Sequence, residues 1–510
     1  MIVILNEVKN LYQDTIVAPA TTPGTGAISI VRLSGPDCFR IVDAVVKLKH
    51  GTISEAKAYT IHYGEVYTPV IQNEVHSVIQ NEVHSVILSE AHSVILSGVE
   101  GSTLLDQVLV SVFHAPHSYT GEDCAEISTH ASSYIVNELV RLLMDAGARF
   151  AQPGEFTRRA FLNGKMDLAQ AEAVADVISS TTAASHRVSM NQLKGGFSQE
   201  LAGLRTELLE MASLLELELD FSEEDVEFAD RSHLAELLDT ALQHVNRLAA
   251  SFKSGNMIKN GVPVAIVGAA NAGKSTLLNA LLGEDRAIVS DIAGTTRDTI
   301  EETLNLGGIL FRFIDTAGIR TSSDSIEKIG IERAFKKISQ AEIVLVLIDP
   351  FEEIPGQLAL LEDKVDASSQ KLFYLVNKAD LLSQNDINKI VTIINNYVTY
   401  VDNKYNVLAL SAKSGLGLNE LKNALTEAEK DLIPNADSVL VTNARHYQSL
   451  VEAAASLTRC RTSLDKGIPS ELLSEDLRSA ISSVNTILGT SLLDPDTILH
   501  SIFSKHCIGK

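Results

Sequence analysis

Residues 268–275 have the composition and spacing of a phosphate-binding loop. They read GAANAGKS, which fits G-x-x-x-x-G-K-[ST], directly after the apolar run 262–267 and before the helical stretch 276–282. The backbone N–H groups of such a loop can cradle phosphates at a helix N-terminus. Lys274 would place a cation on the β and γ phosphates, and the Ser275 hydroxyl would ligate Mg²⁺. The segment predicts a nucleoside triphosphate site.

Three further segments follow in the order of a guanine-nucleotide site. Residues 315–318 read DTAG, where Asp315 can hold the magnesium shell and the Gly318 N–H can meet the γ-phosphate. Residues 377–380 read NKAD, and the Asp380 carboxylate offers two acceptors to the N1–H and N2–H₂ of guanine. Adenine lacks that donor pair, so GTP is selected over ATP. Residues 411–413 read SAK and would support the base.

A switch segment is expected between the first two motifs. Residues 291–298 read DIAGTTRD, and Thr296 there can sense the γ-phosphate by closing on the magnesium. Many GTPases carry a water-orienting Gln just after D-x-x-G, but here that position is Ile319, a hydrocarbon. The water-orienting group and the charge-offsetting cation must then come from elsewhere. The candidates are an acidic residue after Ile319, and an arginine or a monovalent cation near the loop.

The expected nucleotide and metal contacts extend over five segments of the chain. Metal ligation is assigned to Ser275, Thr296 and Asn271. The nucleotide-binding set is Asn271, Ala272, Gly273, Lys274, Ser275, Thr276, Thr295, Asp315, Gly318, Asn377, Lys378, Asp380, Ser411, Ala412 and Lys413.

Apolar runs and helical patterns define the elements that position these motifs. The runs 262–267, 309–314, 343–348, 372–376 and 407–410 alternate with helical stretches. This alternation predicts a parallel sheet with covering helices. Helical patterns stand on both sides of it, at 167–252 and again at 451–464 and 471–488. An α/β domain inserted into a helical domain is therefore expected.

The amino-terminal part mixes strand-like runs with turn signals and contains an internal repeat. The strand-like runs are 27–33, 59–67 and 105–112. Between the last two, an eight-residue unit recurs as VIQNEVHS twice, VILSEAHS and VILSGVEG. The repeat fits neither a helical nor a strand period, so it is interpreted as an insertion into a surface loop. Its three histidines could bind metal, but a duplicated loop is favoured.

Composition narrows the class of protein. Lys and Arg number 42 and Asp and Glu 65 among 510 residues, which gives a net charge of −23. A stand-alone binder of bare nucleic acid is disfavoured by this charge, although a local basic patch or a basic partner remains possible. The four cysteines are far apart, so neither a zinc site nor a disulfide framework is expected. With no secretory signal and no apolar run of membrane-spanning length, a cytoplasmic setting without membrane contact is predicted.

Taken together, these segments resemble the MnmE (TrmE) family, the GTPases that modify the wobble uridine of tRNA. The resemblance covers essentially the whole chain apart from the repeat. Besides the GTPase motifs, it is carried by residues 14–18 (DTIVA), 153–157 (PGEFT), 159–165 (RAFLNGK), 167–173 (DLAQAEA) and the tail 507–510 (CIGK).

The resemblance implies potassium-dependent GTP hydrolysis. The family uses K⁺ as the charge-offsetting cation, held partly by the phosphate-loop Asn, which matches Asn271. Residues 324–330 (DSIEKIG) align with the family's segment for water positioning, which makes Glu327 the expected catalytic residue beside Lys274. The GTPase domains of the family pair face to face when the γ-phosphate is present.

The resemblance also implies a folate site and constitutive dimerisation in the amino-terminal domain. The family binds a tetrahydrofolate derivative, in the 5-formyl or methylene form, as one-carbon donor. The matching positions are Arg32, Glu126, Lys165 and Lys510. A folate needs a cation for its glutamate tail and a carboxylate for its pterin N–H groups. Cys507 in the tail is a candidate for the modification chemistry, but a packing role is equally open.

The implied partner is MnmG (GidA), which carries FAD and forms a heterotetramer with the family's homodimer. The product is an aminomethyl or carboxymethylaminomethyl group at C5 of the wobble uridine of certain tRNAs. Three departures from the family pattern stand out. Ala270 replaces a usual Pro, residues 128–132 (STHAS) replace a glycine-rich segment, and the repeat lies in the folate-binding domain.

The expected organisation has four segments. A folate-binding and dimerisation domain of α+β type covers 1–163, with the insertion at 70–102. The helical domain covers 164–258 and 434–510, and a Ras-like GTPase domain covers 259–433. One alternative is a ribosome-assembly GTPase, but no G-x-x-G clamp with a basic tail follows the GTPase motifs. Another is a signalling switch, which leaves the folate-type residues and the tail unexplained.

Overall fold

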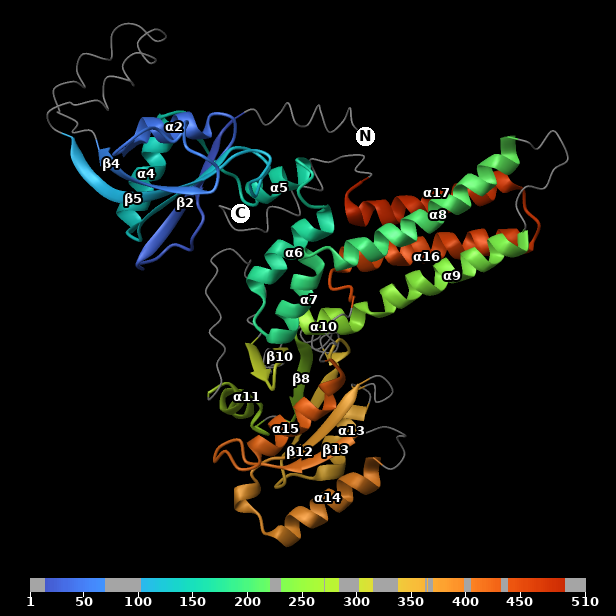
Figure 1. The fold of residues 1–510 in the computed structure, drawn as a ribbon. Coiled ribbons are helices and arrows are strands. Elements are labelled where there is room, and N and C mark those ends of the chain that lie inside the picture. Colours follow the sequence, from blue (N-terminus) through green and yellow to red (C-terminus); the bar gives the residue numbers. More distant parts are fainter. Residues whose placement is uncertain are drawn as a thin grey trace, which may run out of the picture. The chain divides into compact units, whose positions relative to one another are not determined.

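The computed structural model describes residues 14–68, 102–220, 231–269, 271–283, 302–314, 338–362, 365, 370–398, 405–432 and 439–490. The chain divides into two compact units, Met1–Ala175 with Asn485–Lys510, and Asp176–Val484 (Figure 1). The octad repeat lies outside the described residues. The expected domain borders at 163, 258 and 433 stay predictions. None of the helices within the described ranges is long and apolar enough to cross a membrane.

The first unit is built on a seven-stranded sheet of order β3-β4-β5-β6-β2-β1-β7. Its strands are β1 (Ile16–Pro19), β2 (Ile28–Ser34), β3 (Val46–Leu48), β4 (Thr60–Thr68), β5 (Thr103–Phe113), β6 (Cys124–His130) and β7 (Arg149–Phe150). β1 and β7 are parallel and all other neighbours antiparallel. The strands predicted at 27–33, 59–67 and 105–112 are confirmed as β2, β4 and β5.

The two faces of this sheet differ because side chains alternate along each strand. One face packs against α2 (Cys38–Val45) and α4 (Ser133–Asp145) in a core of aliphatic side chains. The other face presents large apolar side chains that are between 38% and 68% exposed, namely Ile28, Ile61, Tyr63 and Leu109. Strand register places Tyr63 opposite Leu109, and Ile61 follows on the same face of β4, so these three side chains are neighbours. Ile28 stands apart on β2, opposite His130.

Helices from two distant parts of the chain form the helical body of the second unit. The long helices are α8 (Gly196–Asp220), α9 (Arg231–Ala250), α16 (Ala444–Asp465) and α17 (Ser470–Leu488), and α7 (Ala183–Leu193) and α10 (Phe252–Asn260) belong to the same unit. The border between the two units falls within α6 (Leu168–Ser179) and near the end of α17. Figure 1 shows α8 beside α17 and α9 beside α16. Arg478 of α17 pairs with Glu216 of α8 at 2.8 Å. The expectation of a helical domain split in sequence is confirmed.

The part of the second unit that carries the predicted nucleotide motifs contains a six-stranded sheet of order β13-β12-β11-β8-β10-β9. Its strands are β8 (Val262–Gly268), β9 (Glu302–Leu306), β10 (Ile309–Ile314), β11 (Ile343–Ile348), β12 (Lys371–Val376) and β13 (Tyr405–Ala409). The five predicted runs are five parallel strands. The predicted parallel sheet is confirmed for these five strands, and a sixth strand that was not predicted, β9, pairs antiparallel with β10 at one edge. Polar residues alternate with Leu304 and Leu306 in β9, a half-buried pattern without a continuous apolar run.

Helices cover both faces of this sheet. They are α11 (Lys274–Leu282), α13 (Ile354–Glu362), α14 (Gln384–Val398) and α15 (Leu418–Ala428). Alternate residues of β11 enter the two cores: Leu345 packs on the side of α11 and α15, and Val346 on the side of α13 and α14. A strand buried on both faces reads as a continuous apolar run, which explains why β11 is visible in the sequence.

Candidate functional site

The phosphate loop connects β8 to α11 through backbone conformations that its glycines permit. Gly273 has φ +100° and Asn271 has φ +64°, both in the left-handed region. A Cβ at Gly273 would stand 2.5 Å from Nδ2 of Asn377, and one at Gly268 would stand 2.4 Å from the carbonyl oxygen of Leu347. Both glycines are therefore required by close contacts with other elements as well as by the loop conformation.

Lys274 and Ser275 stand at the first turn of α11, where the loop ends. The Lys274 Nζ donates to the carbonyl oxygens of Gly268 (3.0 Å) and Ala269 (2.8 Å), which belong to the loop itself. Burial lowers the pKa of Lys274 from its ordinary value. An anionic phosphate at this position would replace neutral acceptors with charged ones, which favours the ammonium form. Ser275 and Thr276 are exposed, as ligand-contacting hydroxyls at this position must be.

Asn377 joins three of the five predicted nucleotide segments. Its side chain is almost completely buried, with 3% of the residue exposed. Nδ2 donates to the carbonyl oxygen of Ala272 in the phosphate loop at 2.7 Å, and Oδ1 accepts from the N–H of Ala412 at 3.0 Å. The segments 268–275, 377–380 and 411–413 therefore meet at one side chain.

The base-recognition segment lies beside this junction. Asp380 is exposed in a 3-10 turn, η3 (Ala379–Leu381), and the Ala379 N–H donates to the carbonyl oxygen of Leu410 at 3.0 Å. Lys413 is exposed as well, whereas Ser411 is buried. Ser411 accepts from the N–H of Ser414 at 3.2 Å and so shapes the turn. This arrangement leaves the Asp380 carboxylate at the surface, accessible to a guanine.

Lys378 has a partner that the sequence analysis missed. Its Nζ lies 2.5 Å from Oδ2 of Asp349, which directly follows β11. The backbone of Lys378 has φ +57°, a left-handed conformation uncommon for a residue with a side chain. An acidic residue directly after a buried strand was the available signal, since β11 and β12 are parallel and end side by side.

Several predicted residues lie outside the described part of the chain, and their roles stay predictions. They are Thr295, Thr296, Asp315, Gly318, Glu327, Cys507 and Lys510. Among the described cation candidates, Asn271 and Ser275 are both exposed at the loop. Amide and hydroxyl oxygens accessible at a phosphate loop suit Mg²⁺ and K⁺ ligation.

The folate candidates gather around one loop of the first unit. Arg32 of β2 stands opposite Glu126 of β6 in the strand register, and their side chains pair at 2.7 Å. The Arg32 guanidinium lies 5.3 Å from the Tyr119 ring. Lys165 donates to the carbonyl oxygen of Pro116 at 3.0 Å. Arg32, Glu126 and Lys165 thus lie along the loop 114–123, as a common ligand site requires.

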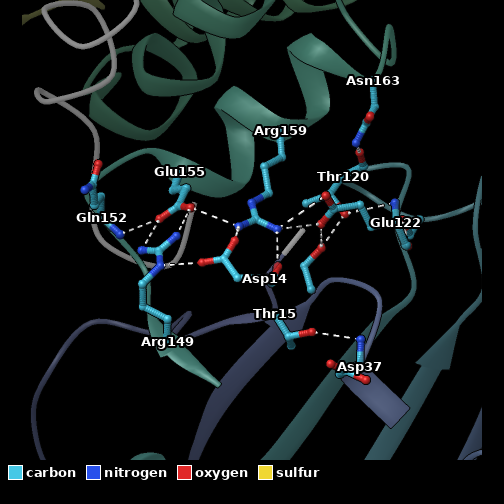
Figure 2. A network of polar contacts seen from close by, with 12 residues as sticks. Asp14, Thr15, Asp37, Thr120, Glu122, Arg149, Gln152, Glu155, Arg159 and Asn163 are labelled. Atoms are coloured by element: carbon cyan, nitrogen blue, oxygen red, sulfur yellow. Dashed lines mark hydrogen bonds and ion pairs between the residues drawn. The ribbon is translucent and has the colours of Figure 1, made fainter. Parts of the chain in front are cut away.

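An ion-pair network anchors that loop (Figure 2). Arg159 of α5 (Glu155–Leu162) is 1% exposed, and its Nη2 lies 2.7 Å from Oδ1 of Asp14 and 3.1 Å from Oε1 of Glu155. Its Nη1 lies 3.3 Å from Oε2 of Glu122, in the loop. Arg149 pairs with Glu155 at 2.5 Å. Burial alone would raise the pKa of Glu155, but hydrogen bonds from Arg149 and from a backbone N–H and the charge of Arg159 outweigh it, and the pKa is lowered.

The sequence predicted no role for this network, although segment 159–165 carried part of the resemblance. Its members are far apart along the chain, at positions 14, 122, 149, 155 and 159. The network fixes Glu122, and with it the loop whose Tyr119 lies against Arg32. It therefore acts as a support for the candidate folate site.

Comparison with known proteins agrees with this geometry. The model of the MnmE helical domain matches residues 168–507, and that of the GTP-binding protein TrmE N-terminus matches residues 15–165. A protein of Bacteroides fragilis named tRNA modification GTPase MnmE is 47% identical over 504 residues, which cover 98% of this chain and 100% of the relative. A protein of the same name from Bacteroides thetaiotaomicron is 46% identical, with the same coverage.

Similar solved structures cover only part of the chain. Aquifex aeolicus Era bound to GDP·AlF₄⁻ is 25% identical and has a TM-score of 0.28, over 38% of this chain and 66% of that chain. The FeoB G-domain of Methanococcus jannaschii is 26% identical with a TM-score of 0.24, over 33% of this chain and 98% of that chain. The matches to the two domain models and to full-length relatives together settle the family. This chain belongs to the MnmE family of GTPases.

Proposed function

We propose that this GTPase is a cytoplasmic, potassium-dependent enzyme of tRNA modification. It would act with an FAD-containing partner of the MnmG (GidA) type to add an aminomethyl or carboxymethylaminomethyl group to C5 of the wobble uridine of certain tRNAs. The observation that carries the proposal is the junction at Asn377, which brings together the segments expected to bind phosphates and guanine, in a chain that is 47% identical to a tRNA modification GTPase over 98% of its length.

The described residues support a division of roles in GTP binding. Lys274 would bind the β and γ phosphates, and Ser275 would hold Mg²⁺, which supplies charge neutralisation on the phosphate oxygens. Asp380 would accept from the guanine N1–H and N2–H₂ groups. Exchanging Asp380 for Asn replaces one acceptor oxygen with a donor. We expect Asp380→Asn to bind xanthosine diphosphate better than GDP, because xanthine has a carbonyl where guanine has an amino group.

The potassium proposal rests on Asn271 and on the lack of a usual catalytic group, because Ile319 stands where many GTPases carry a water-orienting Gln. Asn271 is exposed at the phosphate loop in a left-handed conformation, which leaves its amide oxygen accessible to a cation. GTP turnover should be at least about tenfold faster in KCl than in NaCl, and Asn271→Ala should remove that difference. Asn279→Ala, an exposed Asn in the same helix-loop region, is the matched control. Equal turnover of the wild type in both salts would refute the role of potassium.

The folate proposal rests on the Arg32–Glu126 pair. Two of the three guanidinium nitrogens of Arg32, Nε and Nη2, contact Oε1 of Glu126, and Oε2 would then accept from the N–H groups of a pterin. We expect Glu126→Gln to weaken binding of 5-formyltetrahydrofolate about tenfold, as measured by calorimetry. Glu138→Gln, on the opposite face of the sheet in α4, should leave it unchanged.

A homodimer is supported by the open face of the first sheet. An apolar surface formed by Ile61, Tyr63 and Leu109 is the kind of patch that association covers. Leu109→Arg should convert the dimer to a monomer in sedimentation experiments. Met144→Arg places the same change at an apolar residue on helix α4, also exposed, and should leave the dimer intact.

The modification itself is tested in a strain that lacks the gene. Mass spectrometry of its tRNA should show an unmodified C5 at the wobble uridine, restored by the wild-type chain but not by Lys274→Ala. Normal modification in the deletion strain would refute the proposed function. Normal modification together with defective ribosomal subunits would favour the ribosome-assembly alternative.

A further inference from the structure

Asp349 is a nearly buried carboxylate at the edge of the guanine-binding segment. Only 4% of the residue is exposed. Its Oδ2 accepts from Lys378 Nζ at 2.5 Å, and its Oδ1 accepts from the N–H of Phe351 at 3.1 Å. Ile348 stands opposite Val376 in the parallel pairing of β11 and β12, so Asp349 follows one strand where Asn377 and Lys378 follow the other.

Gln357 of α13 holds Asp349 in place. Its Oε1 accepts from the backbone N–H of Asp349 at 2.9 Å, and its Nε2 donates to the backbone carbonyl oxygen of Asp349 at 2.8 Å. Gln357 is itself 7% exposed. Two hydrogen bonds to the same residue fix its backbone, and the carboxylate is thereby held facing Lys378.

The Lys378 side chain is consequently held at both ends. Its backbone is left-handed and directly follows Asn377, which is bonded to the phosphate loop. Its Nζ lies against Asp349 and 5.8 Å from the Phe351 ring. A lysine normally loses much rotamer entropy when it is ordered. Here the hydrocarbon stem is ordered in the protein itself, so a ligand that packs on the stem does not have to order it.

A purely stabilising role explains this pair poorly. A buried carboxylate loses hydration that a single ion pair repays incompletely, so such pairs are weak sources of stability. An apolar residue after β11 would fill the same space without that cost. The pair is instead placed next to the two residues, Asn377 and Asp380, on which the guanine site depends.

We propose that Asp349 is a positioning residue for guanine recognition, which acts by holding Lys378 extended beside the base site. The Lys378 stem then forms a preorganised wall for the base, and Nζ is kept away from Asp380, whose carboxylate stays available to guanine. The inference rests on the guanine site proposed above. It adds Asp349 and Gln357 to the residues that determine nucleotide affinity.

A double-mutant cycle on the full-length protein tests this role. The variants are Asp349→Asn, Lys378→Met, which keeps the stem but removes the charge, and the double variant. The probe is a fluorescent GDP derivative, with inorganic tripolyphosphate as a competitor that lacks a base. We expect Asp349→Asn to weaken GDP binding about tenfold in the wild-type background and by less than about twofold in the Lys378→Met background. Tripolyphosphate binding should change by less than about twofold, because this probe has no base to meet Lys378 and the bond of Asn377 to the phosphate loop is kept in these variants.

Two further variants separate positioning from folding. Asp386→Asn removes an exposed carboxylate of the same domain and should leave GDP binding unchanged. Asp349→Glu keeps the charge and should retain most of the affinity, which also provides the comparison if Asp349→Asn does not fold. Equal weakening by Asp349→Asn in both backgrounds, or parallel loss of tripolyphosphate binding, would overturn the role of Asp349. Failure of the wild type to bind GDP would overturn the guanine site itself.

Discussion

Asn377, at the end of β12, donates to the carbonyl oxygen of Ala272 in the phosphate loop at 2.7 Å. The same side chain accepts from the N–H of Ala412. The segments expected to bind the base and the phosphates are thus joined by one buried amide. The backbone position of each segment therefore depends in part on its contact with the other, and so does the geometry that a ligand would meet there.

Replacing Asn377 with Ala should weaken nucleotide binding strongly. The change leaves the Ala272 carbonyl and the Ala412 N–H without their buried partner, and each such loss costs about 1–3 kcal/mol. We expect at least a tenfold loss in GDP affinity by fluorescence titration, which is about 1.4 kcal/mol. Asn388→Ala, on the exposed side of α14, is the control. Unchanged GDP affinity in Asn377→Ala would show that the coupling is not needed.

The network around Arg159 should make the first unit sensitive to acid. The pKa of Glu155 is lowered from its ordinary value of 4.5, so its ionised form is favoured in the folded state. Its contribution is therefore complete above about pH 4.5 and is lost as the pH falls through the lowered pKa. Glu155→Gln should cost about 3 kcal/mol at neutral pH, since it leaves Arg159 buried beside one less charge.

Hydrogen exchange of the α5 amides as a function of pH measures this effect. The difference between wild type and Glu155→Gln should shrink as the pH falls below the lowered pKa, because the wild-type carboxyl is then neutral too. Glu138→Gln, in an exposed pair with Arg141, should cost less than about 1 kcal/mol. A difference that stays constant from neutral to acidic pH would contradict the assignment.

Gly255 marks a tight contact inside the second unit. A Cβ at this position of α10 would stand 2.2 Å from the carbonyl oxygen of Val441, where the chain returns from the GTPase part. Gly255→Ala should destabilise the unit by about 1–3 kcal/mol in urea denaturation. Gly203→Ala in α8 meets nothing within 4 Å and should be neutral or stabilising by up to about 1 kcal/mol. A stable Gly255→Ala variant would show that the backbones can separate at little cost.

The octad repeat should be dispensable for folding. Thr68 and Thr103 are paired at the ends of β4 and β5, so the chain on either side of the repeat is already joined by the sheet. An Asn-Gly turn in place of residues 69–102 should keep this register and stabilise the first unit by roughly 2 kcal/mol, because a shorter loop costs less closure entropy. Thermal unfolding and 5-formyltetrahydrofolate binding provide the measurements. A lower thermal unfolding midpoint or weaker binding of 5-formyltetrahydrofolate in the variant would show that the first unit needs the repeat.

The strands of the GTPase sheet could be predicted from the sequence where both faces of the strand are buried. Residues 343–348 form an unbroken apolar run because β11 is covered on both faces. β9 was missed because it is a short edge strand whose residues alternate between polar and apolar. The helical bundle was also predictable in outline, since its leucines recur at helical spacing, but the side-by-side placement of α9 and α16 was not.

The sequence by itself determined the groups that could bind a phosphate and a guanine, because each motif lies within eight residues and local backbone conformation suffices to build it. Tertiary structure decided how the motifs work together. The contacts of Asn377 with Ala272, of Lys378 with Asp349 and of Arg159 with Asp14 join residues from 29 to 145 positions apart. Such pairs are brought together by strand order and helix packing, and the pattern of residue types along the chain specifies neither of them.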